Sequence, residues 1–146
     1  MKPIIYIIFL TFSFISYSQD GLVNFGNFRM HTNAKLGIYG NLTNNGNFSN
    51  NLGEVHLIGA SIQNISGNNF IQTNNLILNN LSNIKLDNEL QVSSLMTFTN
   101  GVLITDRSDN SSEFLHFLPG SSHTNASSLS YTDGVVRKTG NTRFEF

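Results

Sequence analysis

The acidic side chains between positions 106 and 113 are the residues of this sequence best suited to metal chemistry. Asp106, Asp109 and Glu113, with Asn110 among them, offer the hard oxygen ligands that Ca²⁺ prefers. Their spacing matches neither the EF-hand loop nor the glycine-rich nonapeptide calcium repeat. We therefore interpret the segment as a solvated polar loop. Asp106, Asp109 and Glu113 stay as weak candidates for a metal site, and the sequence predicts no metal and no cofactor.

A second group of carboxylates could support general acid–base chemistry. Asp87 and Glu89 are two residues apart, so both would project from one face of a strand, as the two carboxylates of a glycosidase do. The chain has no Trp to line a sugar-binding groove and no Gly-x-Ser-x-Gly nucleophile motif. The four histidines show no metal-ligand spacing, and we expect His116 and His123 to face solvent. The sequence thus predicts no catalytic residue and no enzymatic activity.

The first 18 residues have the layout of a secretory signal peptide. Lys2 precedes an apolar run from Ile4 to Ile15, and small serines stand three and one positions before Gln19. The run is shorter than the roughly 20 residues that a membrane-spanning helix needs. We therefore predict cleavage between Ser18 and Gln19, export to the cell surface or medium, and no membrane span in the mature chain.

Composition narrows the possible partners. The chain has 8 Lys+Arg against 9 Asp+Glu, so it lacks the basic field that nucleic acid requires. Charged residues make up only 12% of the chain, and solubility must come largely from the 22 asparagines and the many serines and threonines. There is no Cys, so the exported chain gains no disulfide. The sequence predicts no nucleic-acid partner.

Short apolar-x-apolar couplets, separated by Asn, Gly and Ser, recur along the chain. Each couplet places two apolar side chains on one face of a short strand. Leu36, Val55, Leu76 and Met96 begin couplets that are 19, 21 and 20 residues apart. Leu42 and Ile62 extend the same period. A fixed period near 20 indicates a solenoid, in which stacked units bury a face that one unit cannot.

Two all-β architectures fit this pattern. The period favours a parallel β-solenoid (β-helix-like) with coils of about 20 residues. Asn abundance agrees with it, because Asn tolerates left-handed corners and its amides can hydrogen-bond from coil to coil. An antiparallel β-sandwich is the alternative, favoured by the hairpin dipeptides Asn45-Gly46, Asn100-Gly101 and Asp133-Gly134. For the solenoid we predict these inward residues: Leu36, Ile38, Leu42, Val55, Leu57, Ile62, Leu76, Leu78, Ile84, Leu86, Leu90, Val92, Met96, Phe98, Val102 and Ile104.

The end of the chain resembles a pattern of secreted and cell-surface proteins of Bacteroidota. In that pattern Ser-Tyr-x-Asp/Asn-Gly-Pro-Val-Arg-Lys-x-Gly precedes Phe-x-Phe-Pro-x-Gly, and Val135 here replaces the first Pro. The matching residues are Ser130-Tyr131, Asp133-Gly134, Val136-Arg137-Lys138, Gly140 and Phe144-Glu-Phe146. The resemblance implies an Asn-rich substrate of the type IX secretion system. It also implies an N-terminal fragment, because the chain stops inside the motif.

Together these features predict three segments: the signal peptide (1–18), Asn-rich β-solenoid repeats (19–130) and the start of a following β module (131–146). We expect a non-enzymatic structural or adhesive region of a larger cell-surface protein. Its partners would be surface polysaccharide or other surface components, and its C-terminal edge would pair with the following module. The alternative is a carbohydrate-active enzyme or a carbohydrate-binding module on a parallel β-helix.

Overall fold

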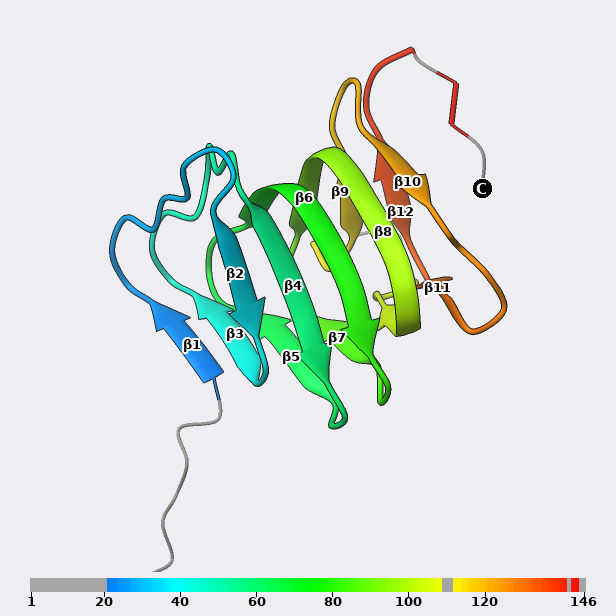
Figure 1. The fold of residues 1–146 in the computed structure, drawn as a ribbon, viewed down its shortest axis with the longest axis horizontal. Helices are drawn as coiled ribbons and strands as arrows, with labels where there is room; N and C mark the ends of the chain where they lie inside the picture. Colours follow the sequence, from blue (N-terminus) through cyan, green and yellow to red (C-terminus); the bar gives the residue numbers. More distant parts are fainter. Residues whose placement is uncertain (1–20, 109–111, 142, 145–146) are drawn as a thin grey trace, which may run out of the picture.

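The computed structural model describes residues 21–108, 112–141 and 143–144, and over these ranges the chain is all β without a helix. Every pairing between its strands is parallel. The strands stack into a β-solenoid of about five turns (Figure 1). The predicted solenoid is confirmed, and the parallel pairing excludes the antiparallel sandwich. The predicted signal peptide, with Ser18 and Gln19, lies outside the described residues.

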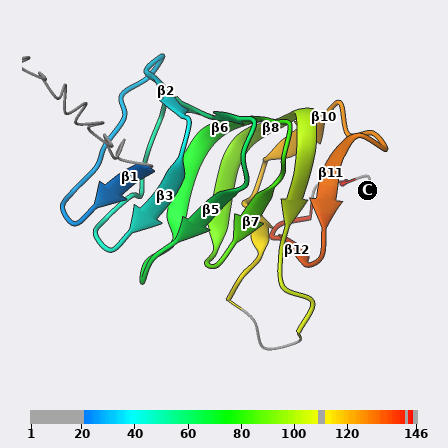
Figure 2. The ribbon, with the colours of Figure 1, turned by 90° about the horizontal axis from the view of Figure 1, so that it is seen from below.

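The strands form three parallel ladders, which we name A, B and C. Ladder A, visible in Figure 2, comprises β1 (Gly21–Asn24), β3 (Asn41–Asn44), β5 (Gln63–Ser66), β7 (Ile84–Leu86), the last residues of β8 (Leu90–Ile104) and β11 (Ser130–Asp133). Ladder B comprises β2 (Lys35–Ile38), β4 (Glu54–Gly59), the second half of β6 (Ile71–Asn80), the middle of β8 and β10 (Ser122–Thr124). Ladder C comprises the start of β6, the start of β8, β9 (Leu115–Phe117) and β12 (Val136–Lys138).

The period that the couplets predict is the register of ladder B. Leu36 pairs with Val55, Val55 with Leu76, and Leu76 with Met96. Because strand side chains alternate, this register stacks the inward residue of each coil on that of the previous coil. The repeat in the sequence is therefore a repeat in space.

The interior is a continuous apolar column. Most of the predicted inward residues are buried, and Leu36 is half-buried against the core. The correctly predicted buried residues are Ile38, Leu42, Val55, Leu57, Leu76, Leu78, Ile84, Leu86, Leu90, Val92, Met96 and Phe98. The prediction missed Met30, Phe48, Ile65, Ile71, Leu103, Phe114, Leu115 and Phe117, which are also buried.

The core prediction was wrong for three residues. Ile62 is 66% exposed, because the connection between β4 and β5 is longer than that between β2 and β3. Leu42 consequently pairs with Ile65, 23 residues away, and not with Ile62. Ile104 is exposed and Val102 only half-buried, because Leu103 between them points inward.

The inward position of Leu103 follows from how β8 turns its corner. Gly101 lies at the corner with a φ of 85°, a conformation that favours glycine. A Cβ atom there would stand 1.8 Å from the Asn80 carbonyl oxygen, so only glycine permits this approach. The turn interrupts the alternation that the couplet Val102-Leu103-Ile104 had suggested.

Buried asparagine amides join neighbouring coils at the corners. Asn24 Nδ2 donates to Asn44 Oδ1 at 2.8 Å, and Asn44 Nδ2 donates to the Phe70 carbonyl at 2.8 Å. Each of these two amides also accepts a backbone N–H two residues further on, from Gly26 and Gly46 respectively. One side chain thus closes the corner of its own coil and bonds to the next. This confirms the predicted coil-to-coil bonding.

Asparagine also supplies the left-handed corners. The non-glycine residues with positive φ among the described ranges are Asn33, Asn50, Asn83 and Asn125, with φ of 66°, 55°, 92° and 62°. Asn tolerates this region better than other side chains because its short amide can bond locally. The frequency of Asn in this chain therefore has two structural causes, corner geometry and corner hydrogen bonding.

Candidate functional site

A row of polar side chains lies on the outer surface of ladder C. Gln72 pairs with Gln91, Gln91 with His116 and His116 with Arg137, so the four outward side chains stand one above another on successive strands. Adjacent strands are about 4.8 Å apart, so the row offers a regular series of donors and acceptors. Glu89 lies beside this row, immediately before β8. We call these five residues the outer polar row.

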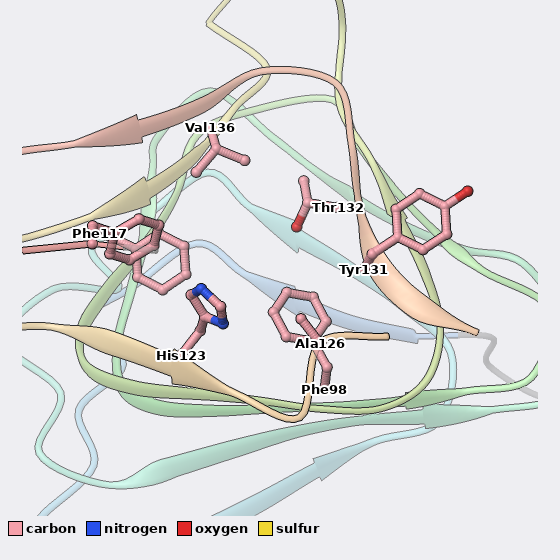
Figure 3. Close-up of a pocket in the computed structure, with 8 residues that line it drawn as sticks. Phe98, Phe117, His123, Ala126, Tyr131, Thr132 and Val136 are labelled. Carbon is pink, nitrogen blue, oxygen red and sulfur yellow. The ribbon is translucent and has the colours of Figure 1, made fainter. Parts of the chain in front are cut away.

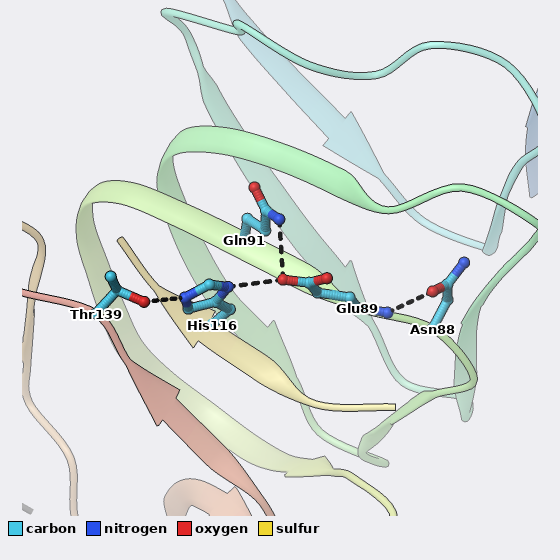
Figure 4. Close-up of polar contacts among 5 residues, drawn as sticks. All are labelled: Asn88, Glu89, Gln91, His116 and Thr139. Atoms are coloured by element: carbon cyan, nitrogen blue, oxygen red, sulfur yellow. Dashed lines mark hydrogen bonds and ion pairs between the residues drawn. The ribbon is translucent and has the colours of Figure 1, made fainter. Parts of the chain in front are cut away.

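His116 joins three successive coils within this row (Figure 4). Its Nδ1 lies 2.7 Å from Glu89 Oε1, and its Nε2 lies 2.6 Å from Thr139 Oγ1. Gln91 Nε2 donates a further hydrogen bond to the same Glu89 oxygen at 2.9 Å. The His116 side chain projects from the outer face, as predicted, but its contacts leave it only 13% exposed.

The order carboxylate, imidazole, hydroxyl fits one tautomer of the imidazole. In that tautomer Nδ1 of His116 donates to the Glu89 carboxylate, and Nε2 accepts from the Thr139 hydroxyl. Such an arrangement can take a proton from a hydroxyl, and it can also hold three coils together. Sequence reasoning missed the contact because the inserted loop 106–113 breaks the 20-residue period between Glu89 and His116.

The three residues of the motif Val136-Arg137-Lys138 each have a separate contact. Val136 packs against the core, whereas the Arg137 guanidinium lies 4.0 Å above the ring of Phe114. Lys138 Nζ donates to the carbonyl oxygens of Leu118 and Ser121 at 2.9 and 3.0 Å. The motif thus fastens the last described strand to the coil before it.

At the C-terminal end the interior column opens into an apolar recess of about 150 Å³ (Figure 3). His123 follows Met96 in the inward row of ladder B, so it occupies an interior position where the prediction placed it in solvent. Its ring lies 5.0 Å from that of Phe144 and 6.0 Å from that of Phe98. The recess is lined by Phe98, Phe117, His123, Ala126, Tyr131, Thr132, Val136 and Phe144.

Residues 106–108 and 112–113 of the acidic segment are described, and they lie between β8 and β9 without forming a strand. The Asp106 backbone N–H donates to the Glu113 carbonyl oxygen at 3.2 Å, and the Asp106 carboxylate accepts from Ser108. Arg107 forms an ion pair with Asp133 of β11. Asp109 lies outside the described residues. No group of three potential metal-binding side chains occurs among the residues that the structure describes.

Asp87 and Glu89 have different partners in different ladders. Asp87 pairs with Lys85 of β7 at 2.6 Å, and this contact raises the pKa of the Lys85 ammonium. Glu89 binds His116 of β9. The structure therefore gives no support to a carboxylate pair acting on one bond.

One further ionic group lies on the outer surface of ladder B. Glu54 Oε1 lies 2.5 Å from His56 Nε2 and 3.2 Å from Lys35 Nζ of the preceding coil. The hydrogen bond from His56 lowers the pKa of the Glu54 carboxyl, with a smaller contribution from Lys35, against the opposing effect of burial. The carboxylate is stabilised in its ionised form.

The fold and these surfaces define an Asn-cornered parallel β-solenoid with a polar outer row and an apolar C-terminal recess. No protein-family model, no curated protein and no solved structure matches the chain. The described ranges contain no helix long and apolar enough to cross a membrane.

Proposed function

We propose that this chain is a non-enzymatic, structural and adhesive solenoid region of a larger exported cell-surface protein. The observation that carries the proposal is the C-terminal recess. It lies in line with the inward rows of the solenoid, where the side chains of a further coil would pack. The inward side chains pack from coil to coil, and charged residues make up only 12% of the chain.

The strands around the recess have room for a partner. Within the described ranges β10 and β11 each pair only with β8, and β12 pairs only with β9. Their outer edges therefore present N–H and C=O groups that a following β module can bond. Such a module would cover the recess and continue the ladders in the same direction.

This end pairing predicts self-association of the chain when the following module is absent. Light scattering of residues 19–146 should show association, and extension through the next module should give a monomer. Phe144→Glu places a charge at the recess and should reduce the association, whereas Thr99→Glu on an exposed position of β8 should not. Monomeric behaviour of residues 19–146 at high concentration would refute the proposed end pairing.

The adhesive part of the proposal rests on the outer polar row. Gln, His, Arg and carboxylate side chains at regular spacing suit the hydroxyl groups of an extended surface polysaccharide. Binding to a panel of bacterial polysaccharides should weaken with Gln91→Ala and Arg137→Ala. Thr43→Ala, on the outer surface of ladder A, serves as the matched control. If all three variants bound polysaccharide equally well, the outer polar row would not be the adhesive surface.

The same row supports the alternative, a carbohydrate-active enzyme. The Glu89–His116–Thr139 network places a potential general base beside a hydroxyl, which an adhesin does not need. The two functions differ in product formation. Incubation with polysaccharides should release no fragments; cleavage that depends on Asp87, Asp106 or Glu89 would establish an enzyme.

Export and lineage rest on the signal peptide and on the terminal motif that resembles type IX secretion substrates of Bacteroidota. Mass analysis of exported protein should find an N-terminus at Gln19 after cleavage behind Ser18. An intact Met1 end would contradict this. The complete open reading frame would show whether a sorting domain follows Phe146.

A further inference from the structure

The corners that lead from ladder A towards ladder C repeat a short sequence, rich in Asn and Gly, that ends in Phe. Its three copies are residues 24–28, 44–48 and 66–70. The rings of Phe28 and Phe48 stack at 4.7 Å, and Phe48 is buried. This inward row continues with Ile71, which pairs with Phe48. Phe70 precedes Ile71 and is 40% exposed, so the third copy turns its ring to the outer surface.

A shift of one residue between the sequence copies and the strand register causes this change. Thr43 pairs with Ser66, so Gly67 takes the place that Asn44 has in the preceding coil. Gly67 has a φ of 120°, and a Cβ atom there would lie 2.1 Å from the Asn44 carbonyl oxygen. The outward position that holds an amide in the second coil therefore holds an aromatic ring in the third.

Phe70 forms one wall of a recess of about 310 Å³ on the outer surface. The residues that line this recess are Gly46, Asn47, Phe48, Asn69 and Phe70. On the side of the following coil Ile71 pairs with Leu90, so Glu89 stands next to Phe70 in the outward direction. An exposed ring thus lies between two amides and a carboxylate.

A second ring in the same outward row provides a comparison. Phe114 stands two coils after Phe70, because β9 follows β8 in ladder C. The Arg137 guanidinium lies 4.0 Å above the Phe114 ring, and Phe114 is only 5% exposed. Among the described residues, no aromatic stack and no cation–π contact involves Phe70. Of the two rings, the Phe70 ring is therefore the one whose face is open to a ligand.

The chemistry of the recess selects its ligand. The face of an aromatic ring attracts C–H groups, and the amides of Asn47 and Asn69 can both donate and accept hydrogen bonds. None of the lining residues is charged, and the neighbouring Glu89 carboxylate disfavours an anion. A neutral pyranose with equatorial hydroxyls offers an apolar C–H face and a rim of hydroxyl groups. The volume is at the small end of ligand pockets and suits one or two sugar rings.

We propose that Phe70 is the stacking platform for one sugar unit of a neutral, glucose-type polysaccharide, whose hydroxyl groups bond to Asn47 and Asn69. This inference rests on the proposed adhesive function and names the ligand of that surface. Phe70 and Gln72 flank the inward Ile71 and are about 7 Å apart along the strand, so the platform adjoins the outer polar row. A pyranose unit is about as long as the spacing of the coils, so further units of the polysaccharide continue along the row.

Affinity electrophoresis tests the platform, because retardation in a native gel detects weak binding. The exported chain would migrate through gels that contain laminarin or hydroxyethyl cellulose as neutral glucans, or polygalacturonate as an anionic polysaccharide. Phe70→Ala should weaken binding of the neutral glucans about ten-fold, whereas Phe70→Tyr, which keeps the ring, should stay within about three-fold of the wild type.

Tyr39→Ala is the matched control for a lost aromatic side chain. Tyr39 lies between β2 and β3, on a different corner of the solenoid, and is 74% exposed. Tyr39→Ala should bind the neutral glucans as the wild type does. Phe70 and Tyr39 are both exposed, so the variants should keep the thermal unfolding midpoint close to that of the wild type, and a change in retardation reports binding.

The outcomes separate this site from the proposed function. If Phe70→Ala bound as the wild type while Gln91→Ala bound weakly, the platform would be wrong and the adhesive row would stand. An equal loss in Tyr39→Ala would mean unspecific contact through exposed rings and would overturn the site. Tighter binding of polygalacturonate than of the neutral glucans would overturn the neutral ligand. So would a wild type that neither neutral glucan retards, whereas the adhesive function fails only if the whole polysaccharide panel is not bound.

Discussion

The coils before Ile104 and those after it fill the interior and join neighbouring coils with different types of residue. In the earlier coils aliphatic side chains fill most of the interior, and buried Asn amides close the corners. In the later coils Phe117 and Phe144 pack around His123, and the fastening contacts come from Lys138 and the Arg137–Phe114 pair. The earlier part is periodic, whereas the later part follows a loop that breaks the period.

The difference shows where each part obtains its stability. A corner amide that bonds to two coils repeats with the coil, so any number of coils can use it. A lysine that binds two carbonyl oxygens is a single local contact, suited to one place in the chain. We therefore expect the periodic part to be the more stable part, and the C-terminal coils to open first.

The largest effect should come from a charge in the periodic interior. Leu78 is fully buried, and Leu78→Asp loses apolar burial and leaves an unpaired carboxylate, at a cost of about 3–5 kcal/mol. Ile77→Asp, one residue away on the outer face of β6, should cost less than about 1 kcal/mol. Denaturant unfolding of both variants measures this. Equal losses would show that the strand faces are reversed.

The next effect tests the corner amides. Asn44 is fully buried, and Asn44→Ala leaves the Gly46 N–H, the Phe70 carbonyl and the Asn24 amide without their partner. Each unsatisfied buried group costs about 1–3 kcal/mol, so we expect a loss of at least about 2 kcal/mol. Asn68→Ala is the exposed control and should lie within about 0.5 kcal/mol of the wild type. A small loss at Asn44 would mean that the corners do not stabilise the stack.

A smaller loss of stability should follow from removing the Lys138 contacts that hold the last coil. Lys138→Met removes charge-assisted bonds to two carbonyl oxygens and should cost about 1–2 kcal/mol. Lys85→Met, which removes an exposed ion pair in the periodic part, should destabilise the fold less than Lys138→Met does. Hydrogen exchange should show faster opening of β12 in Lys138→Met only. Uniformly faster exchange would mean that the two parts unfold together.

The smallest effect is electrostatic. The pKa of Glu54 is lowered in the folded chain, so its contribution is present above the unfolded pKa and is lost as pH falls through the lowered value. Glu54→Gln should therefore be less stable than the wild type at pH 7, by under about 1 kcal/mol, and equal to it well below about pH 4. Urea unfolding at the two pH values checks this. If the stability difference between the wild type and Glu54→Gln grew as the pH fell, the pKa of Glu54 would be raised on folding and not lowered.

Much of the periodic part could be predicted from sequence because its signal is local and repeated. The couplets from Leu36 to Phe98 alternate with period two and recur with period 20, and either pattern alone would have been ambiguous. The prediction that Ile62 points inward failed because the number of residues in a corner varies between coils. Composition does not reveal that number. Ile104 failed because the Gly101 turn changes which side chains point inward.

The C-terminal contacts could not be predicted for a different reason. Glu89, His116 and Thr139 come together only because the residues inserted between β8 and β9 return the chain to ladder C. His116 has no metal-ligand spacing to another histidine, so a solvent-facing side chain was the prediction. Its 27-residue separation from Glu89 is one coil plus the inserted loop, a sum that requires the register to be known.

The parallel stacking of short strands across the long axis has a mechanical consequence. A pull on the two ends of the solenoid acts perpendicular to the strands, so it loads the hydrogen bonds of one rung at a time. The coils should then peel away singly from an end, each releasing about 70 Å of extended chain for its roughly 20 residues. A solenoid built in this way should lengthen in steps under tension and absorb work at each step, while the coils that remain keep their structure.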